Sequence, residues 1–157
     1  MDKHEIRIGV ISDTHGLTRP EALTALRGCE RIIHAGDIGT PAVLDALNAI
    51  APTFAVRGNI DAGAWAAGLP ATELVNAGAH LIHVLHDISA LDIDPAGAGF
   101  AAVVFGHSHQ PSIERRAGVL YLNPGSAGPR RFKLPVAVAR ITVAGPQMLP
   151  EIIELQV

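Results

Sequence analysis

Cysteine and long apolar segments are nearly absent from this sequence of 157 residues. Cys29 is its only cysteine, so no disulfide bond can form within the chain, and a reducing compartment is expected. No run of about 18 apolar residues occurs, as a membrane-spanning helix would need, and the apolar stretch near the N-terminus is too short for a signal peptide. We therefore expect a cytoplasmic protein without a membrane partner.

Charged residues are also sparse, and their distribution argues against a nucleic-acid-binding surface. They make up 17% of the chain, and the formal net charge is −3. The pairs Arg115-Arg116 and Arg130-Arg131 are too isolated to form a cationic footprint, so we interpret them as solvated surface. Long nucleic acid is therefore not an expected partner.

Apolar residues are abundant, at 48% of the chain, and they predict a single domain over residues 1–157. In the first half, β-rich runs alternate with helix signals. A capping-box pattern at 18–21 opens one helix that Gly28 closes, and Thr40-Pro41 opens a second helix that runs to about residue 48. Strands are predicted at 5–12, 31–36 and 53–57, so two consecutive βαβ units imply a parallel sheet.

The second half predicts mainly strands. Residues 71–77 and 80–85 form the two strands of a hairpin around Gly78, and Asp94-Pro95 begins a short helix. Further strands are expected at 101–105, 119–122, 136–143 and 152–157. The fold class is therefore α/β, with helices early, antiparallel strands late, and two sheets layered as a sandwich.

Residues with metal-binding side chains follow the predicted strands, each at a carboxyl end. In an open α/β sheet these ends gather along one edge, where ligands bind. Three carboxylate or amide oxygens and four imidazoles could there surround two divalent metals. The residues are Asp13, His15, Asp37, Asn59, His86, His107 and His109.

Each motif taken alone also has an ordinary structural explanation. Asp13 and Asn59 are typical turn residues, and the histidines of GHSH are typical of an exposed loop. At a strand end, however, residues two apart lie on one side, so His107 and His109 can reach a common centre. His80 and His83 are interpreted as structural. The ordered set of seven ligand-type residues favours a metal site over coincidence.

The motifs SDTHG, HAGD, RGNID, LHD, FGHSH and YLNPGS resemble those of the calcineurin-like metallophosphoesterases, in particular their small single-domain bacterial and archaeal phosphodiesterase branch. The resemblance spans Ile8 to about Ser126. It implies a four-layer α-β-β-α sandwich with mixed sheets and a dinuclear metal centre. One metal would take Asp13, His15, Asp37 and His109, and the other would take Asp37, Asn59, His86 and His107.

In this resemblance Asp37 bridges the two metals, and Asp37, Asn59 and His107 are the residues expected to act in catalysis. Two cations clamp the phosphoryl oxygens of a small phosphodiester, and a hydroxide that bridges them attacks the phosphorus. Imidazole, carboxylate and amide ligands suit Mn²⁺, Fe, Zn²⁺, Co²⁺ or Ni²⁺, and the resemblance favours manganese.

Several positions near the expected site require separate interpretation. Ile60 stands where larger members of the family carry a histidine, so we expect no leaving-group acid there and a preference for diesters over monoesters. Asp61 is interpreted as a partner that orients a neighbour, or as a plain turn aspartate. Asp87 replaces the glycine usual after His86, at the rim of the cleft. Asn123 in NPGS is expected to support the GHSH loop.

Two other functions remain open at this point. One eukaryotic relative of the branch is a scaffold subunit of a membrane-trafficking coat, so a catalytically weak, metal-binding interaction subunit is the alternative to an enzyme. A metal-dependent nucleotide-binding module is a third candidate. The complete set of ligand positions favours the enzyme, and the late edge strands could pair between copies of the chain in a homo-oligomer.

Overall fold

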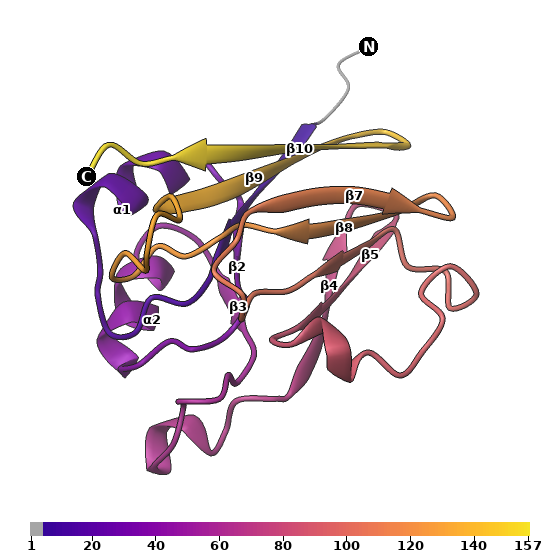
Figure 1. Cartoon of the computed structure of the whole chain (residues 1–157). Coiled ribbons are helices and arrows are strands. Elements are labelled where there is room, and N and C mark those ends of the chain that lie inside the picture. Colours follow the sequence, from indigo (N-terminus) through magenta and orange to yellow (C-terminus); the bar gives the residue numbers. More distant parts are fainter. Residues whose placement is uncertain (1–4) are drawn as a thin grey trace.

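In the computed structural model, which describes residues 5–157, ten strands form two mixed five-stranded sheets that pack face to face (Figure 1). The first sheet has the order β10-β9-β1-β2-β3, and the second has the order β4-β5-β6-β8-β7. None of the helices in this described part is long and apolar enough to cross a membrane.

The first sheet contains the predicted βαβ units. β1 (Glu5–Ile11), β2 (Arg31–His34) and β3 (Thr53–Ala55) are parallel, and α1 (Pro20–Leu26) and α2 (Pro41–Asn48) connect them. Both helices begin at proline, as predicted, because its fixed φ suits the first helical turn. The predicted capping box at 18–21 is wrong, because the N-cap residue of α1 is Arg19 and not Thr18. No side chain caps the N-terminus of either helix.

The second sheet contains the predicted hairpin of β4 (Thr72–Ala77) and β5 (His80–Leu85), followed by β6 (Ala102–Val104) and β8 (Val119–Asn123), which are parallel to β5. The sequence pattern missed β7 (Ser112–Arg116), which pairs with β8. Charged residues dominate β7 because it is an exposed edge strand, so it lacks the apolar alternation of a core strand. Ala117-Gly118, where both φ values are positive, forms the tight turn between β7 and β8, and this turn is the feature that could have indicated a hairpin.

The C-terminal hairpin differs in its boundaries from the prediction. β9 (Ala137–Ala144) pairs with β10 (Gln147–Glu154), which starts after the turn at Gly145-Pro146 instead of at residue 152. Pro150 made this segment look like a turn, but β10 is an edge strand, where a proline is tolerated. The helix expected from Asp94-Pro95 is wrong, since turns occupy this region. Two 3₁₀ helices, η1 (Ala64–Ala66) and η2 (Ile88–Ala90), were not predicted.

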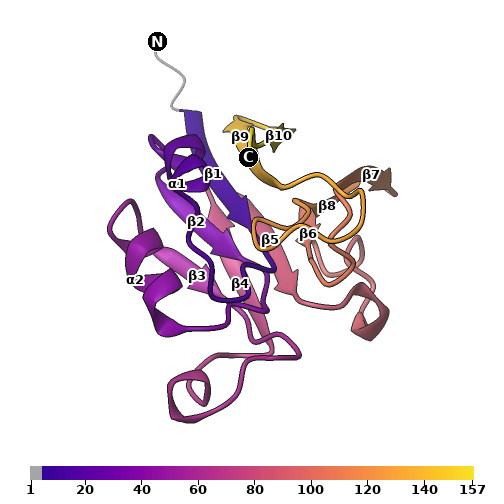
Figure 2. The same ribbon diagram turned by 60° about the vertical axis from the view of Figure 1, so that its left-hand side comes forward.

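The layers follow from the alternation of side chains along the strands. In β1 and β2, Ile8, Val10 and Ile33 face the core between the sheets, whereas Ile32 faces α1 and α2. On the outer face of the second sheet, Val103 and Tyr121 are covered by Ile88 and its neighbouring loop. The two sheets and the helical layer of α1 and α2 are therefore present as predicted (Figure 2), and η2 with loops covers the second sheet in place of α-helices.

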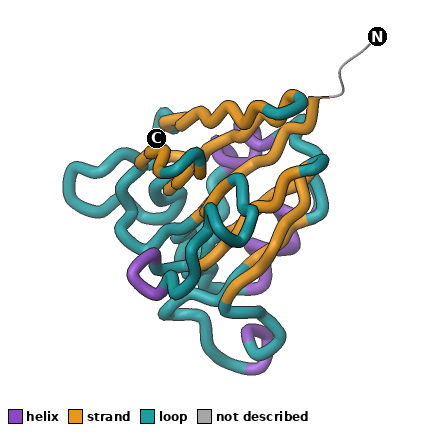
Figure 3. Tube along the Cα trace, turned by 90° about the vertical axis from the view of Figure 1, so that its right-hand side faces the viewer, coloured by secondary structure: helices purple, strands orange, loops and turns teal. Residues whose placement is uncertain are grey.

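The strand ends and most connecting loops gather at the end of the sandwich away from the N-terminus (Figure 3). In the first sheet, the parallel strands β1, β2 and β3 all run toward this end. In the second sheet, the parallel strands β5 and β6 also run toward it. The loops that follow these five strands carry all seven predicted ligand residues.

Candidate metal centre

Backbone hydrogen bonds join the loops that carry the predicted ligands. The amide of Asp13 donates to the carbonyl of Gly36 at 3.0 Å, and the amide of His15 donates to the carbonyl of Asp37 at 3.0 Å. Across the sheets, the amide of Gly106 donates to the carbonyl of His86 at 3.0 Å. The amide of His107 donates to Asp13 Oδ2 at 3.1 Å, so the structure brings together segments that are more than ninety residues apart in the chain.

Five of the predicted ligands form two overlapping groups whose donor atoms lie within 4.8 Å of one another. One group is Asp13, His15 and His109, and the other is Asp13, Asp37 and His86. All five residues are buried except His15, which is partly exposed. These are two candidate sites for divalent cations, in agreement with the expectation of two metals.

The two carboxylates lie between the histidines. Asp37 Oδ2 is 3.3 Å from His86 Nε2 and 3.7 Å from His15 Nε2. Asp13 Oδ1 is 3.4 Å from His109 Nε2 and 4.0 Å from His86 Nε2. Asp37 thus contacts a histidine of each group, as a bridging ligand would, but Asp13 is the member that the two groups share.

The side-chain atoms at the centre fit a bound metal. Asp13 Oδ1, His15 Nε2 and His86 Nε2 are buried and have no hydrogen-bond partner. Leaving such atoms unsatisfied is costly, and buried polar atoms without a partner are rare. Since all three belong to the two groups, one cation in each group would satisfy them.

Hydrogen bonds orient these side chains toward the centre. His86 Nδ1 lies 2.8 Å from the carbonyl oxygen of Ala35, which can only accept, so Nδ1 carries a proton and Nε2 faces the carboxylates. Asp13 Oδ2 accepts from Ser12 Oγ at 2.7 Å and from the amide of His107 at 3.1 Å, which leaves Oδ1 free for a metal.

Electrostatics keep the carboxylate of Asp37 ionised. Burial raises the pKa of Asp37, but the contact with His86, the amide of Ile60 and the nearby His15 outweigh it and lower this pKa to about 2. Burial lowers the pKa of His86, yet Asp37, the Ala35 carbonyl and Asp13 together raise it overall. Burial lowers the pKa of His109, which favours its neutral, metal-binding form.

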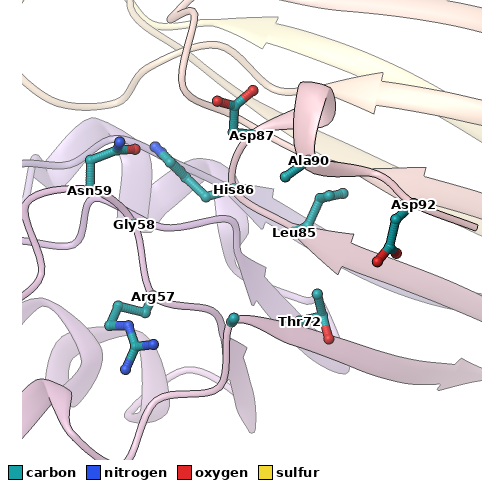
Figure 4. Close-up of a pocket in the computed structure, with 10 residues that line it drawn as sticks. Arg57, Gly58, Asn59, Thr72, Leu85, His86, Asp87, Ala90 and Asp92 are labelled. Atoms are coloured by element: carbon teal, nitrogen blue, oxygen red, sulfur yellow. The ribbon is translucent and has the colours of Figure 1, made fainter.

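Asn59 and His107 lie on the open side of the centre. Both residues are exposed, and neither His107 nitrogen joins the two groups. The ring of His107 stands edge-on to His86 at 5.1 Å, and its Nε2 is 3.8 Å from Asp87 Oδ2. The amide of Asn59 and the ring of His86 point toward one another in Figure 4. Asn59 and His86 border a pocket of about 430 Å³. The other residues that line it are Arg57, Gly58, Ala71, Thr72, Leu85, Asp87, Ala90 and Asp92.

The backbone at the centre adopts strained conformations. Seven non-glycine residues of the described chain have positive φ, and five of them are predicted ligands, namely Asp13, His15, Asp37, His107 and His109. Such conformations cost free energy in most residues and concentrate at functional sites. Here Asp13 and His15 turn toward the same point, whereas the expectation that His107 and His109 reach a common centre is wrong, since only His109 joins a group.

Two glycines allow the loops to approach one another. A Cβ atom on Gly58 would lie 2.2 Å from Asp37 Oδ1, and one on Gly106 would lie 2.6 Å from Asp13 Oδ2. Any side chain at either position would displace a carboxylate of the centre. The glycines before Asn59 and His107 are predicted to let the backbone pass close to the site, and these distances confirm it.

Asp61 holds two loops of the centre through their backbones. Its Oδ1 accepts from the amides of Ile38 and Gly39 at 2.9 and 3.0 Å, and its Oδ2 accepts from the amide of Gly58 at 2.9 Å. The carboxylate is buried. It is therefore more than a turn residue, because it joins the loop of Asp37 to the loop of Asn59.

Asn123 lies beneath the GHSH loop, where the motif analysis expected it. Its Nδ2 donates to the carbonyl of Gly106 at 3.0 Å and to Ser108 Oγ at 3.1 Å, and its Oδ1 accepts from the amide of Gly125 at 2.9 Å. The first two hydrogen bonds hold the GHSH loop, and the third fixes the NPGS turn that supports it.

The structure also places Ile60 and Asp87, which differ from the usual family motifs, and the two histidines interpreted as structural. The side chain of Ile60 is 47% exposed, and its amide donates to Asp37 Oδ1 at 3.1 Å. Asp87 caps η2 by accepting from the amide and hydroxyl of Ser89. His80 and His83 lie outside both groups, since His80 contacts the carbonyl of Gly145 and His83 stacks on Phe100.

His34 is a supporting residue that the sequence analysis missed. Its Nδ1 accepts from the amide of Gly36 at 3.0 Å, and its Nε2 lies 2.9 Å from Thr14 Oγ1. Since the Thr14 hydroxyl donates to the carbonyl of Ile38, His34 Nε2 is the donor of that contact. Burial lowers the pKa of His34 to about 3, so the ring is neutral. The HAGD motif contains His34, but a histidine inside a strand has no distinctive spacing.

Comparisons with known proteins agree with this geometry. A sequence profile of the calcineurin-like phosphoesterase superfamily domain matches residues 6–145. A "Probable metallophosphoesterase" from Methanothermobacter thermautotrophicus is 34% identical over 158 residues, covering 93% of this chain and 91% of that protein.

Solved structures share the fold at lower identity. An archaeal phosphodiesterase superposes with a TM-score of 0.79 at 22% identity, covering 96% of this chain and 100% of that one. Vacuolar Protein Sorting 29 from Cryptosporidium parvum superposes with a TM-score of 0.83 at 18% identity, covering 99% and 93%. Both support the α/β architecture of two mixed sheets with few helices.

Proposed function

This chain belongs to the calcineurin-like phosphoesterase superfamily, as its motifs predicted, and we propose that it is a metal-dependent phosphodiesterase acting on a small phosphodiester. The observation that carries this proposal is the convergence of Asp13, His15, Asp37, His86 and His109 into two groups with buried, unpartnered donor atoms. The archaeal phosphodiesterase of the same fold supports it.

The same residues would hold two divalent cations, and Asn59 and His107 would join them from the open side. Bound cations would polarise the phosphoryl oxygens and lower the pKa of a bound water to near neutrality. Carboxylate and imidazole ligands suit a first-row transition metal, and we propose Mn²⁺. Asp37 contributes a carboxylate that stays ionised, because its pKa is about 2.

The pocket beside His86 and Asn59 would receive one arm of the diester. No side-chain acid stands at Ile60, whose amide instead donates to Asp37. An ester whose leaving group needs little protonation would therefore react best, which supports a diester with a good leaving group over a monoester.

Hydrolysis of bis-p-nitrophenyl phosphate with Mn²⁺ tests the proposal. The wild-type protein should release p-nitrophenol, and Asp37→Asn should lose most of this activity and bind less metal. Asp45→Asn, an exposed position on α2, is the matched control and should behave as wild type.

Two results would contradict the proposal in different ways. Equal turnover in Asp37→Asn would remove the bridging role from this carboxylate. A fully metal-loaded protein that hydrolyses neither diesters nor monoesters would favour the scaffold function, which Vacuolar Protein Sorting 29 makes the second candidate on the basis of fold alone.

A further inference from the structure

The loop between β8 and β9 presents an aromatic side chain to solvent among cations. Phe132 is 94% exposed and has a φ of 52°, a conformation that disfavours a bulky residue. Arg130, Arg131 and Lys133 flank it in the sequence. Within residues 5–157, no hydrogen bond or ion pair engages these three cationic side chains. The loop therefore carries apolar area and positive charge that no other part of the described chain uses.

The start of this loop is packed against the metal centre. Ser126 Oγ donates to the carbonyl of Asp13 at 3.0 Å, and the amide of Ala127 donates to the carbonyl of Ser12 at 3.1 Å. Gly128 is so close that a Cβ there would lie 2.3 Å from the carbonyl oxygen of Asp13. Three residues further on, Arg131 is separated from this contact by at most about 11 Å of chain.

Arg131 and Phe132 form the outer part of this loop. The amide of Leu134 donates to the carbonyl of Arg131 at 3.1 Å, which closes a turn with Phe132 at its tip. The loop thus starts beside Asp13, whereas the pocket of Arg57 and Asp92 borders the centre next to His86.

We propose that Arg131 and Phe132 bind the nucleotide arm of a nucleotidyl phosphodiester, with Arg131 on the phosphoryl group and Phe132 stacked on the base. This inference rests on the proposed function, because a diester that spans the two metal groups needs a contact for each arm. A guanidinium pairs well with phosphate, and an exposed aromatic ring stacks on any base.

An open hollow of about 790 Å³ borders Phe132, Lys133 and Leu134. Only these three residues line it, so a base there would be held by one stacked face and would not be enclosed. Stacking on an aromatic side chain corresponds to about 5- to 150-fold in affinity per base. The open geometry predicts the lower part of this range and little selectivity among bases.

An anionic lipid surface is the other ligand that cations around an exposed ring could recognise. One phenylalanine on a short turn offers little area for insertion, and the loop adjoins Asp13 instead of projecting from a separate face. These two observations favour the nucleotide, and vesicle binding is therefore one outcome of the test.

The experiment compares two diesters with the same leaving group in Mn²⁺. Thymidine 5′-(p-nitrophenyl phosphate) carries a base on its second arm, and ethyl p-nitrophenyl phosphate does not. Phe132→Ala should lower kcat/KM for the thymidine ester at least fivefold, mainly through KM, and change the ethyl ester less than twofold. Phe132→Trp should retain the wild-type preference. Arg131→Ala should raise KM for both esters, since both contain the phosphoryl group.

Leu149→Ala is the matched control, because Leu149 is a half-exposed apolar residue on β10, and it should leave both esters unchanged. An equal loss for both esters in Phe132→Ala, or no loss for either, would overturn the inference. Unchanged ester kinetics with Phe132-dependent binding to phosphatidylserine vesicles would also overturn it, in favour of a lipid surface.

Failure of the proposed function can be recognised separately. If the Mn²⁺-loaded wild type hydrolyses neither ester, calorimetric titration with thymidine 5′-monophosphate measures the loop alone. Binding that weakens at least fivefold in Phe132→Ala would support the inference without an enzyme. No binding, or equal dissociation constants in wild type and variant, would refute it.

Discussion

Replacement of Asp61 by alanine should loosen the metal centre without touching a predicted ligand. The Asp61 carboxylate accepts hydrogen bonds from the amides of Ile38, Gly39 and Gly58, which lie in the loops of Asp37 and Asn59. In Asp61→Ala these donors lose their acceptor, and the two loops lose their connection.

The loss of folding stability in Asp61→Ala can be estimated for each of the three amide donors in turn. The amide of Ile38 belongs to a fully buried residue, so losing its bond to a charged acceptor costs about 1.5–3 kcal/mol. Gly39 and Gly58 are partly exposed and can regain water, so we assign about 0.5–1 kcal/mol to each. The total is about 2.5–5 kcal/mol, which corresponds to a fall in Tm of roughly 10 °C for a domain of this size.

Thermal and urea unfolding of the metal-free protein measure this loss of stability, and titration with Mn²⁺ measures metal affinity. We expect metal to bind about 10- to 100-fold more weakly, as when other outer partners of metal ligands are removed. Asp61→Asn should lose less stability, since its amide oxygen still accepts. Asp45→Ala is the control on an exposed surface. A Tm within 2 °C of wild type with unchanged metal affinity would refute the reasoning.

Two further predictions concern backbone approach and pH. Gly58→Ala should abolish metal binding, because its Cβ would lie 2.1 Å from the amide nitrogen of Asp37, whereas Gly68→Ala meets no atom within 4 Å and should bind metal normally. The pKa of His34 falls from 6.5 to about 3 on folding, so the unfolded chain binds a proton that the folded chain does not. The contribution of His34 to the free energy of unfolding is therefore complete above pH 6.5. It is lost as pH falls toward 3, by up to about 1.4 kcal/mol per pH unit. The free energy of unfolding of metal-free His34→Asn, measured with urea, should lack this pH-dependent part. An identical pH dependence in the wild type and the variant would contradict the prediction.

Local patterns were sufficient for most of the fold. β-rich runs and early prolines located β1, α1, β2 and α2, because an apolar stretch or an N-terminal proline constrains the backbone wherever it occurs. Edge strands were the exception. β7 and β10 are exposed on one or both faces and obtain their pairing from β8 and β9, so their own sequences need no apolar alternation.

The candidate ligands could be identified for a related reason. Asp13, Asp37 and the GHSH histidines are chemically distinctive, and their order after successive strands implied a shared edge of the sheet. Their supporting residues were harder to identify. His34 acts from inside a strand, and Asp61 acts on backbone amides, so neither role has a residue-type signature along the chain.

The sequence by itself determined the family, the identity of the candidate ligands and the sandwich of two sheets, since side-chain chemistry and strand periodicity are local properties. Only the tertiary structure decided that Asp13 belongs to both donor groups, that His107 lies outside them, and that Ser126 packs against the backbone of Asp13. The physical reason is that distances between loops depend on sheet packing and strained backbone angles, which no single stretch of sequence specifies.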